Sequence, residues 1–195
     1  MKCYKSLIYI LFAVGVLFSI AMAGDQDGDR LEYEIKAAFL VNFAKFSQWP
    51  AAKEDINKPI FIGVIGLSPF SKEVTDALES KKVNERTVKI NSFAGYKEHK
   101  KLPKEEFEKT VSELQACHIL FICQSESDIF NEINEAVSNS SVMTVSDIPG
   151  FVDAGGIINF VIDNTKVGFE VNVKAATDAK IEIRSQMLRV AKNNK

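Results

Sequence analysis

Histidines and cysteines, the residues most often used for metal binding and nucleophilic catalysis, are few in this sequence. There are two histidines and three cysteines among 195 residues. His99 lies in a lysine-rich stretch, and His118 lies in an apolar run beside Cys117. A metal site needs several converging ligands, and an activated serine or cysteine needs a base within reach. The sequence holds no C-x-x-C, H-E-x-x-H or G-x-S-x-G motif, so we expect no catalysis, no metal site and no cofactor.

A glycine-containing turn offers a different chemistry. Gly66 and Ser68 lie between the apolar run Ile60–Ile65 and a helix that we predict to begin at Pro69, with Ser68 as its N-cap. A helix N-terminus presents backbone N–H groups that can hold an anion. The turn matches neither the G-x-G-x-x-G motif nor a P-loop. Two interpretations stay open: an ordinary strand-to-helix turn, or a site for a small anionic ligand at Gly66 and Ser68.

Three residues near the C-terminus are candidates for contact with a protein partner. Phe151 follows Pro149 and Gly150 in a glycine-rich loop over 147–155, where an exposed aromatic side chain could anchor a partner. Burial of Phe151 is the alternative. Asp153 and Glu170 could form an acid–base pair, but nothing in the sequence brings them together. We therefore interpret them as part of a solvated face that a partner could contact.

The apolar periodicity predicts the elements that position these residues. The periodicity of the first helix places six residues on one apolar stripe: Leu31, Ile35, Ala38, Phe39, Phe43 and Phe46. Its phenylalanines predict a core face or, as the alternative, a protein interface. Strands and helices then alternate, which indicates a parallel sheet, whereas residues 156–173 indicate an antiparallel β-hairpin with its turn at 163–166. The predicted strands are 60–65, 87–90, 117–123, 142–145, 156–162 and 167–173, with a brief strand at 181–183. The predicted helices are 31–46, 69–79, a short one through 107–114, 125–137 and a last one from 185.

The fold class follows from this order of elements. We expect one α/β domain of three layers, with a mainly parallel sheet, helices on both of its faces and a C-terminal antiparallel β-hairpin. Cys117 and Cys123 fall within one predicted strand, about 20 Å apart. A disulfide needs Cα atoms within about 7 Å, so we expect these cysteines to be unpaired with each other, either buried or with one paired to another chain.

The N-terminus has the pattern of a signal peptide over residues 1–23. Lys2 and Lys5 precede an apolar run from Leu7 to Ile20, and Ala21-Met22-Ala23 matches the A-x-A pattern, which places cleavage after Ala23. An uncleaved membrane anchor is the alternative. Residues 24–195 would then form one domain.

Cleavage changes the charge of the chain. Lys2 and Lys5 leave, so 24 basic residues become 22 against 26 acidic ones, a net charge of −4. Nucleic-acid binding depends on clustered lysine and arginine, so a mildly acidic chain is not expected to bind nucleic acid.

Several segments together resemble one protein family. The segment 33–50 (YEIKAAFLVNFAKFSQWP) resembles the opening helix of YfiR-family periplasmic proteins, and 62–66 (IGVIG) and 117–122 (CHILFI) resemble two of their strands. The closest resemblance is in 150–161 (GFVDAGGIINFV), followed by 169–176 (FEVNVKAA) and 185–191 (SQMLRVA). The resemblance keeps its order over nearly all of residues 24–195.

The resemblance implies a periplasmic repressor. YfiR proteins inhibit a membrane-bound diguanylate cyclase by binding its extracytoplasmic sensor domain, which lowers cyclic di-GMP and biofilm formation, and dimers are described for them. Some members are redox-sensitive through disulfides, one of which joins the counterpart of Cys117 to a cysteine in the first strand. This chain has Ile62 and Gly63 there, so such a switch is not expected. A periplasmic module that binds a small solute or anion is the alternative function.

Overall fold

The structure is a computed structural model that describes residues 28–163 and 166–192. The predicted signal peptide, its cleavage after Ala23 and residues 164–165 of the hairpin turn lie outside the described residues. Among the described residues, no helix is both long enough and apolar enough to cross a membrane.

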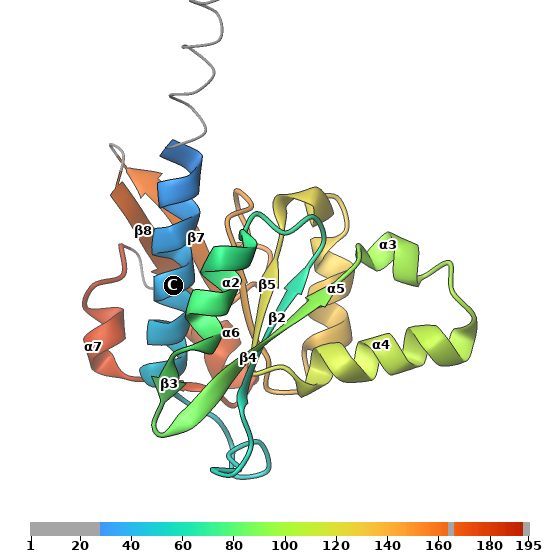
Figure 1. Cartoon of the computed structure of the whole chain (residues 1–195), viewed down its shortest axis with the longest axis horizontal. Coiled ribbons are helices and arrows are strands. Elements are labelled where there is room, and N and C mark those ends of the chain that lie inside the picture. The colour runs from blue at the N-terminus through green and yellow to red at the C-terminus, as the bar shows by residue number, and fades with distance from the viewer. Residues whose placement is uncertain (1–27, 164–165, 193–195) are drawn as a thin grey trace, which may run out of the picture.

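A curled seven-stranded sheet forms the centre of the molecule (Figure 1). The five central strands are parallel, and a two-residue strand and the β7–β8 hairpin add antiparallel strands at the two edges. Apolar runs explain the buried strands β2 and β5. β6 is equally inaccessible to solvent, although its sequence MTVS is half polar. In spatial order the strands are β3 (Lys82–Val83), β4 (Arg86–Phe93), β2 (Ile60–Ile65), β5 (Ile119–Ile122), β6 (Met143–Ser146), β7 (Ile158–Asp163) and β8 (Lys166–Val171).

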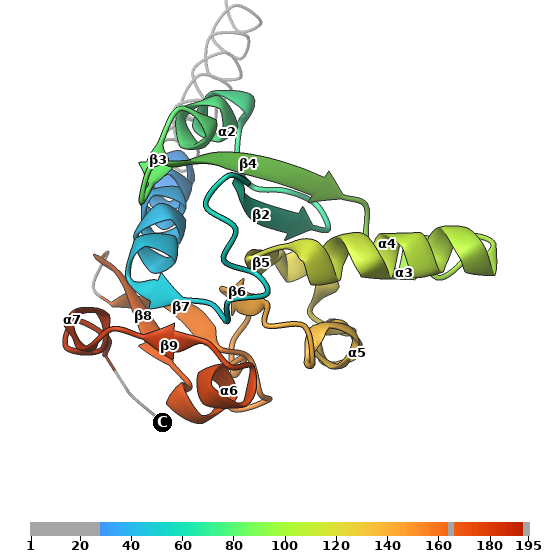
Figure 2. The ribbon, with the colours of Figure 1, turned by 90° about the horizontal axis from the view of Figure 1, so that it is seen from below.

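Helices cover both faces of the sheet, which confirms the predicted three-layer α/β class. The first helix, residues 28–45, lies on one face and contributes Leu40 and Phe43 to a core that it shares with the last helices. The opposite face packs against α4 (Lys104–Ala116) and α5 (Phe130–Val137) through Leu114 and Ile133. Figure 2 shows the sheet curling around the first helix, with α4 and α5 on the other side. The remaining helices are α2 (Lys72–Glu79), α3 (Tyr96–His99), α6 (Val173–Asp178) and α7 (Ser185–Leu188).

A second, two-stranded sheet ties the two ends of the described chain together. β1 (Ser47–Gln48) follows the first helix and pairs in antiparallel fashion with β9 (Glu182–Ile183). The Arg184 N–H also donates to the carbonyl oxygen of Phe46 at 2.9 Å. The C-terminal segment is thereby held against the end of the first helix.

The local structure differs from the prediction at several places. The N-cap of α2 is Ser71, whose side chain accepts from the Val74 N–H, so the helix begins after the predicted Pro69. The stretch 125–137 starts with a 3-10 turn (Gln124–Glu126) before α5. β3 was not predicted; it forms because Asn84 and Glu85 adopt positive φ angles of 48° and 68° and turn the chain back onto β4.

Candidate functional site

Two backbone donors of the predicted anion turn are already used within the protein. The Gly66 N–H donates to the Phe93 carbonyl at 3.2 Å, and the Leu67 N–H donates to the Ser125 hydroxyl at 2.9 Å. The Ser68 hydroxyl accepts from the Phe70 N–H at 3.2 Å rather than capping a helix. Gly66 has φ +100°, and a Cβ there would come within 2.4 Å of the Ser125 hydroxyl, which explains the glycine.

A buried carboxylate next to this turn also disfavours an anion. Glu126 is buried and accepts from the Tyr96 N–H at 2.9 Å and from the Ser125 hydroxyl at 3.3 Å. It follows β5 and lies beside the end of β2, where the strand order of the sheet reverses and open α/β folds usually bind ligands. A carboxyl group in this crevice presents acceptor oxygens where an anion would need donors. The contacts therefore argue against an anion site at Gly66 and Ser68.

The predicted partner residues do not form one surface. Phe151 is completely buried: its ring centroid lies 5.4 Å from that of Phe130, and a Cβ at Gly156 would overlap the ring. The prediction of Phe151 as a surface anchor is therefore wrong, because distant residues that the local sequence does not reveal enclose it. Asp153 is exposed and lines a hollow beside α6, whereas Glu170 is half-buried on β8 and does not line that hollow.

The cysteines lie in separate halves of the interior. Cys117 belongs to the core beneath α4 and α5, and Cys123 belongs to the core beneath the first helix. Simple alternation along one strand would put both on the same face, but β5 begins only at Ile119. Both thiols are free and buried, and burial raises the pKa of each to about 12. Thiols with such pKa values are poor nucleophiles at neutral pH.

A polar cluster closes the amino ends of the central strands. The Phe61 N–H donates to His118 Nδ1 at 3.1 Å, and Arg86 Nη2 lies 3.0 Å from His118 Nε2. Burial, followed by the charge of Arg86, lowers the pKa of His118 to about 4, so the imidazole is neutral. The Lys53 ammonium donates to the carbonyls of Gln115, Ser140 and Ser141 at 2.7–3.0 Å.

These contacts give the cluster a structural function. The ammonium of Lys53 uses its three hydrogens on backbone carbonyls, so it joins the end of α4 to the loop before β6. Among the residues that the structure describes, no group of three or more metal-ligating side chains comes together.

A buried ion pair fixes the orientation of the first helix. The Lys36 ammonium lies 2.5 Å from Asp147 Oδ2 and 2.5 Å from Glu32 Oε1, and the Tyr33 hydroxyl donates to Asp147 Oδ2 at 2.9 Å. Burial and the charge of Asp147 raise the pKa of Tyr33, so it stays a donor. Sequence reasoning missed this contact. Lys36 lies four residues before Leu40 and seven before Phe43, which places it on the core face of the helix. A lysine at a core position could have indicated the buried ion pair.

With its core face fixed in this way, the first helix turns a second apolar face toward solvent. Leu31 is 58% exposed, Ile35 is 38% exposed, and the exposed Ala38 continues this outer ridge, which ends at the polar Asn42. The predicted single stripe is therefore wrong in placing Leu31, Ile35 and Ala38 on the same face as the buried Phe43. We call the ridge and the two hollows beside it the first-helix surface. Isolated exposed apolar residues are common, but a continuous set of them marks an interaction site.

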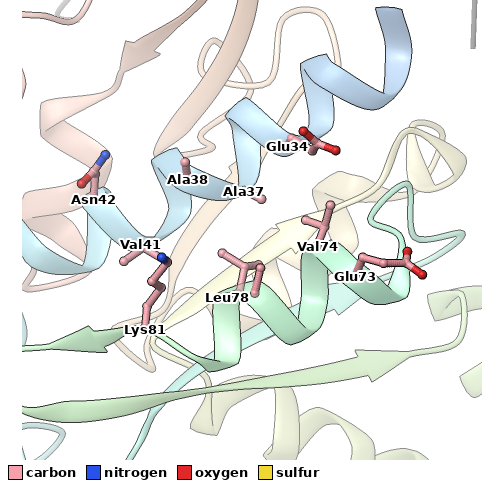
Figure 3. Close-up of a pocket in the computed structure, with 10 residues that line it drawn as sticks. Glu34, Ala37, Ala38, Val41, Asn42, Glu73, Val74, Leu78 and Lys81 are labelled. Atoms are coloured by element: carbon pink, nitrogen blue, oxygen red, sulfur yellow. The ribbon is translucent and has the colours of Figure 1, made fainter. Parts of the chain in front are cut away.

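One hollow of the first-helix surface is a groove between the first helix and α2 (Figure 3). Its volume is about 500 Å³. Its walls are mainly apolar, with charged residues only toward its ends. We call it the α2 groove. It is lined by Glu34, Ala37, Ala38, Val41, Asn42, Glu73, Val74, Ala77, Leu78 and Lys81.

The other hollow lies between the first helix, β8 and α7. It has a volume of about 240 Å³ and is lined by aromatic and aliphatic side chains, including Phe39, Phe46, Phe169, Met187 and Val190. Phe39 packs against Phe43 and Phe169, with ring centroids 5.8 and 5.5 Å apart. The first-helix surface therefore suits the binding of an apolar partner surface rather than a reaction.

Comparisons with known proteins agree with this fold. The family model DUF4154, described as YfiR/HmsC-like, matches residues 33–192. No curated protein matches the sequence. Among solved structures, a conserved domain protein from Vibrio cholerae O1 biovar El Tor str. N16961 is similar with a TM-score of 0.51 at 11% identity, over 74% of this chain and 57% of that chain. The ABC domain in complex with L-Trp from Streptococcus pneumonia gives 0.49 at 16% identity, over 74% of this chain and 60% of that chain.

These matches differ in what they establish. This chain spans less than two thirds of either solved chain, and at 11% identity the Vibrio likeness shows the fold alone. The family model, in contrast, covers most of the sequence, including the greater part of the first helix, the whole seven-stranded sheet and α7. The chain belongs to the YfiR/HmsC-like family.

Proposed function

We propose that this protein is a periplasmic regulator that binds the extracytoplasmic sensor domain of a membrane-bound diguanylate cyclase and holds that enzyme inactive. Membership of the YfiR/HmsC-like family is the observation that carries the proposal. A repressor works in this way only if it binds the inactive state of the cyclase more tightly than the active state. Repression lowers cyclic di-GMP and, with it, biofilm formation.

The first-helix surface supports a binding role and is the contact surface that we propose. It combines exposed Leu31 and Ile35 with two apolar hollows. Apolar patches with pockets are the usual centres of protein–protein interfaces. The ion pair between Lys36 and Asp147 holds this face outward before any partner binds, so little ordering is needed on binding.

Deletion of the gene tests the regulatory role. We expect cyclic di-GMP and biofilm to rise in the deletion strain and to return to the starting level when the chain is supplied from a plasmid. Mass spectrometry of nucleotide extracts measures the first quantity and surface staining the second. Unchanged cyclic di-GMP after deletion would contradict the proposal.

Binding is tested separately with purified proteins. The extracytoplasmic sensor domain of a diguanylate cyclase encoded beside this gene is titrated with the chain in a calorimeter, and saturable heat with a defined stoichiometry is expected. Light scattering of the free chain tests the homodimer that the family resemblance implies. Absence of binding to every such sensor domain of the same organism would exclude direct repression.

Export is part of the proposal. We expect the chain to be cleaved after Ala23, so that the protein recovered from a periplasmic extract begins at Gly24. Intact mass measurement distinguishes this form from a chain that keeps its first 23 residues. A full-length mass in the membrane fraction would indicate an uncleaved anchor.

A further inference from the structure

The α2 groove has a geometry that favours one kind of occupant. The first helix and α2 run side by side in the same direction along its two walls (Figure 3). Small side chains, Ala37, Ala38 and Ala77, line its middle. Glu34 and Asn42 lie eight positions apart in the first helix, so this wall is about 12 Å long, and the α2 wall ends just beyond the helix at Lys81. That length equals about two turns of a third helix.

The charges of the α2 groove are divided between its ends. Glu34 and Glu73 lie at the end where both helices begin, and Lys81 and Asn42 lie at the opposite end (Figure 3). Arg30 pairs with Glu34 at 3.0 Å, but both side chains are exposed, and exposed pairs are weak and easily exchanged. Hydrogen bonds from its own N–H and from Ser71 lower the pKa of Glu73, so it is ionised at neutral pH.

We propose that the α2 groove receives an amphipathic α-helix of the partner, running antiparallel to the first helix and α2. This inference rests on the proposed function, because it names the element of the partner that binds. Apolar side chains spaced at i, i+4 and i+7 would fill the middle of the groove. An acidic first turn of the incoming helix would lie at Lys81, and a basic last turn would lie at Glu34 and Glu73.

The charge pattern gives the incoming helix its direction. Helices are stabilised by acidic residues in their first turn and basic residues in their last turn. An antiparallel helix with this ordinary pattern meets opposite charges at both ends of the α2 groove, whereas a parallel one meets like charges at both ends. Its dipole also opposes those of the first helix and α2, which is favourable. The alanines allow its backbone to approach closely, near the usual helix–helix distance of about 8–10 Å.

Two synthetic peptides provide the probe. Both are 16-residue, end-blocked and side-chain-stapled helices with leucines at i, i+4 and i+7. One carries glutamates in its first turn and lysines in its last, and the other has these charges exchanged. We expect the purified chain to bind the first about tenfold more tightly, measured by fluorescence anisotropy at low salt. The variant Glu34→Lys/Glu73→Lys/Lys81→Glu should reverse the preference.

A groove-filling substitution supplies the second measurement. Ala77→Trp places a large side chain in the α2 groove and should abolish binding of the preferred peptide. Asp76→Trp, on the neighbouring exposed position of α2, is the matched control and should bind normally. Circular dichroism confirms that both variants are folded.

The outcomes separate this inference from the proposed function. Equal affinity for both peptides, no binding of either, or normal peptide binding by a folded Ala77→Trp variant would overturn the inference. Loss of the homodimer in Ala77→Trp, with unchanged affinity for the peptide, would also overturn the inference. That result would mean that a second copy of the chain occupies the groove. If Ala77→Trp still binds the sensor domain and represses, the inference fails while the proposed function stands. Unchanged cyclic di-GMP in the deletion strain contradicts the proposed function whatever the peptides do.

Discussion

Single buried charges decide how the first helix is presented. Lys36 and Asp147 are each about 95% or more buried and lie in contact, with Glu32 and the Tyr33 hydroxyl completing the cluster. Such a pair need not add net stability, because both charges lose their hydration. Its effect is on specificity: only one rotation of the helix brings Lys36 to Asp147. That rotation turns Leu31 and Ile35 outward.

Removing one charge of the Lys36–Asp147 pair should destabilise the protein. In Lys36→Met, Asp147 remains buried without its partner, and we expect the free energy of unfolding to fall by about 3–5 kcal/mol. Urea denaturation measures the loss. The double variant Lys36→Met/Asp147→Asn should recover part of it, because the unpaired charge is removed. Lys72→Met, which breaks the exposed pair with Asp76, is the control and should leave stability unchanged. An equal loss of stability in Lys36→Met and Lys72→Met would contradict the special role of the buried pair.

His118 should make stability depend on pH. Its pKa is about 4 in the folded protein against an ordinary value of 6.5, mainly because of burial. The unfolded chain therefore binds the proton more readily between these values, so stability falls as pH decreases from about 6.5 to about 4. The full effect is on the order of 3 kcal/mol.

The variant His118→Gln isolates this contribution. The difference in unfolding free energy between the wild type and the variant should change across pH 6.5 to 4 and stay constant above pH 7. Carboxylates titrate in the same range, but they are shared by both proteins and cancel in the difference. A difference that is constant over the whole range would show that His118 is not buried in its neutral form.

At the scale of elements, α2 depends on a cap that the sequence alone places wrongly. Ser71 has φ −66° and ψ 166°, and its side chain accepts from the Val74 N–H. Ser71→Ala should therefore cost about 1 kcal/mol of stability in thermal or urea unfolding. Ser68→Ala, at the predicted cap, should have a smaller effect because Ser68 serves only the local turn. The opposite order would favour the predicted helix start.

How far the sequence predicts an element depends on the origin of its stability. The run Ile60–Ile65 predicts β2 because a strand buried on both faces consists of consecutive apolar residues. β3 has no such sequence pattern, because it has only two residues and depends on positive φ angles at Asn84 and Glu85. The burial of Phe151 depends on Phe130 and Gly156. The α2 groove was likewise not predictable, because it lies between two helices that the sequence separates by β1, β2 and their loops.

At the scale of the whole molecule, the curled sheet determines which surface is offered to a partner. The sheet wraps around the first helix (Figure 2), so β8 and α7 lie on one side of that helix and α2 lies on the other. A single helix is thereby flanked by two apolar hollows. The amino ends of the strands are closed by Lys53, Arg86 and His118, and the crevice at the end of β2 is filled by Glu126. Among the described residues, the first-helix surface is therefore the face best suited to bind a regulated partner.

Charged side chains on this surface should abolish binding without unfolding the protein. Leu31→Glu/Ile35→Glu replaces two exposed apolar side chains, so the thermal midpoint should be unchanged, whereas affinity for the sensor domain should fall at least tenfold. Cyclic di-GMP in a deletion strain carrying this variant should stay at the deletion level. Ile56→Glu is the matched control, because Ile56 is 71% exposed and lies in the loop before β2, outside the first helix. Full repression by the double variant would show that the partner does not bind at the first helix. The interface would then lie on another face, where Asp153 or Glu170 could still contribute.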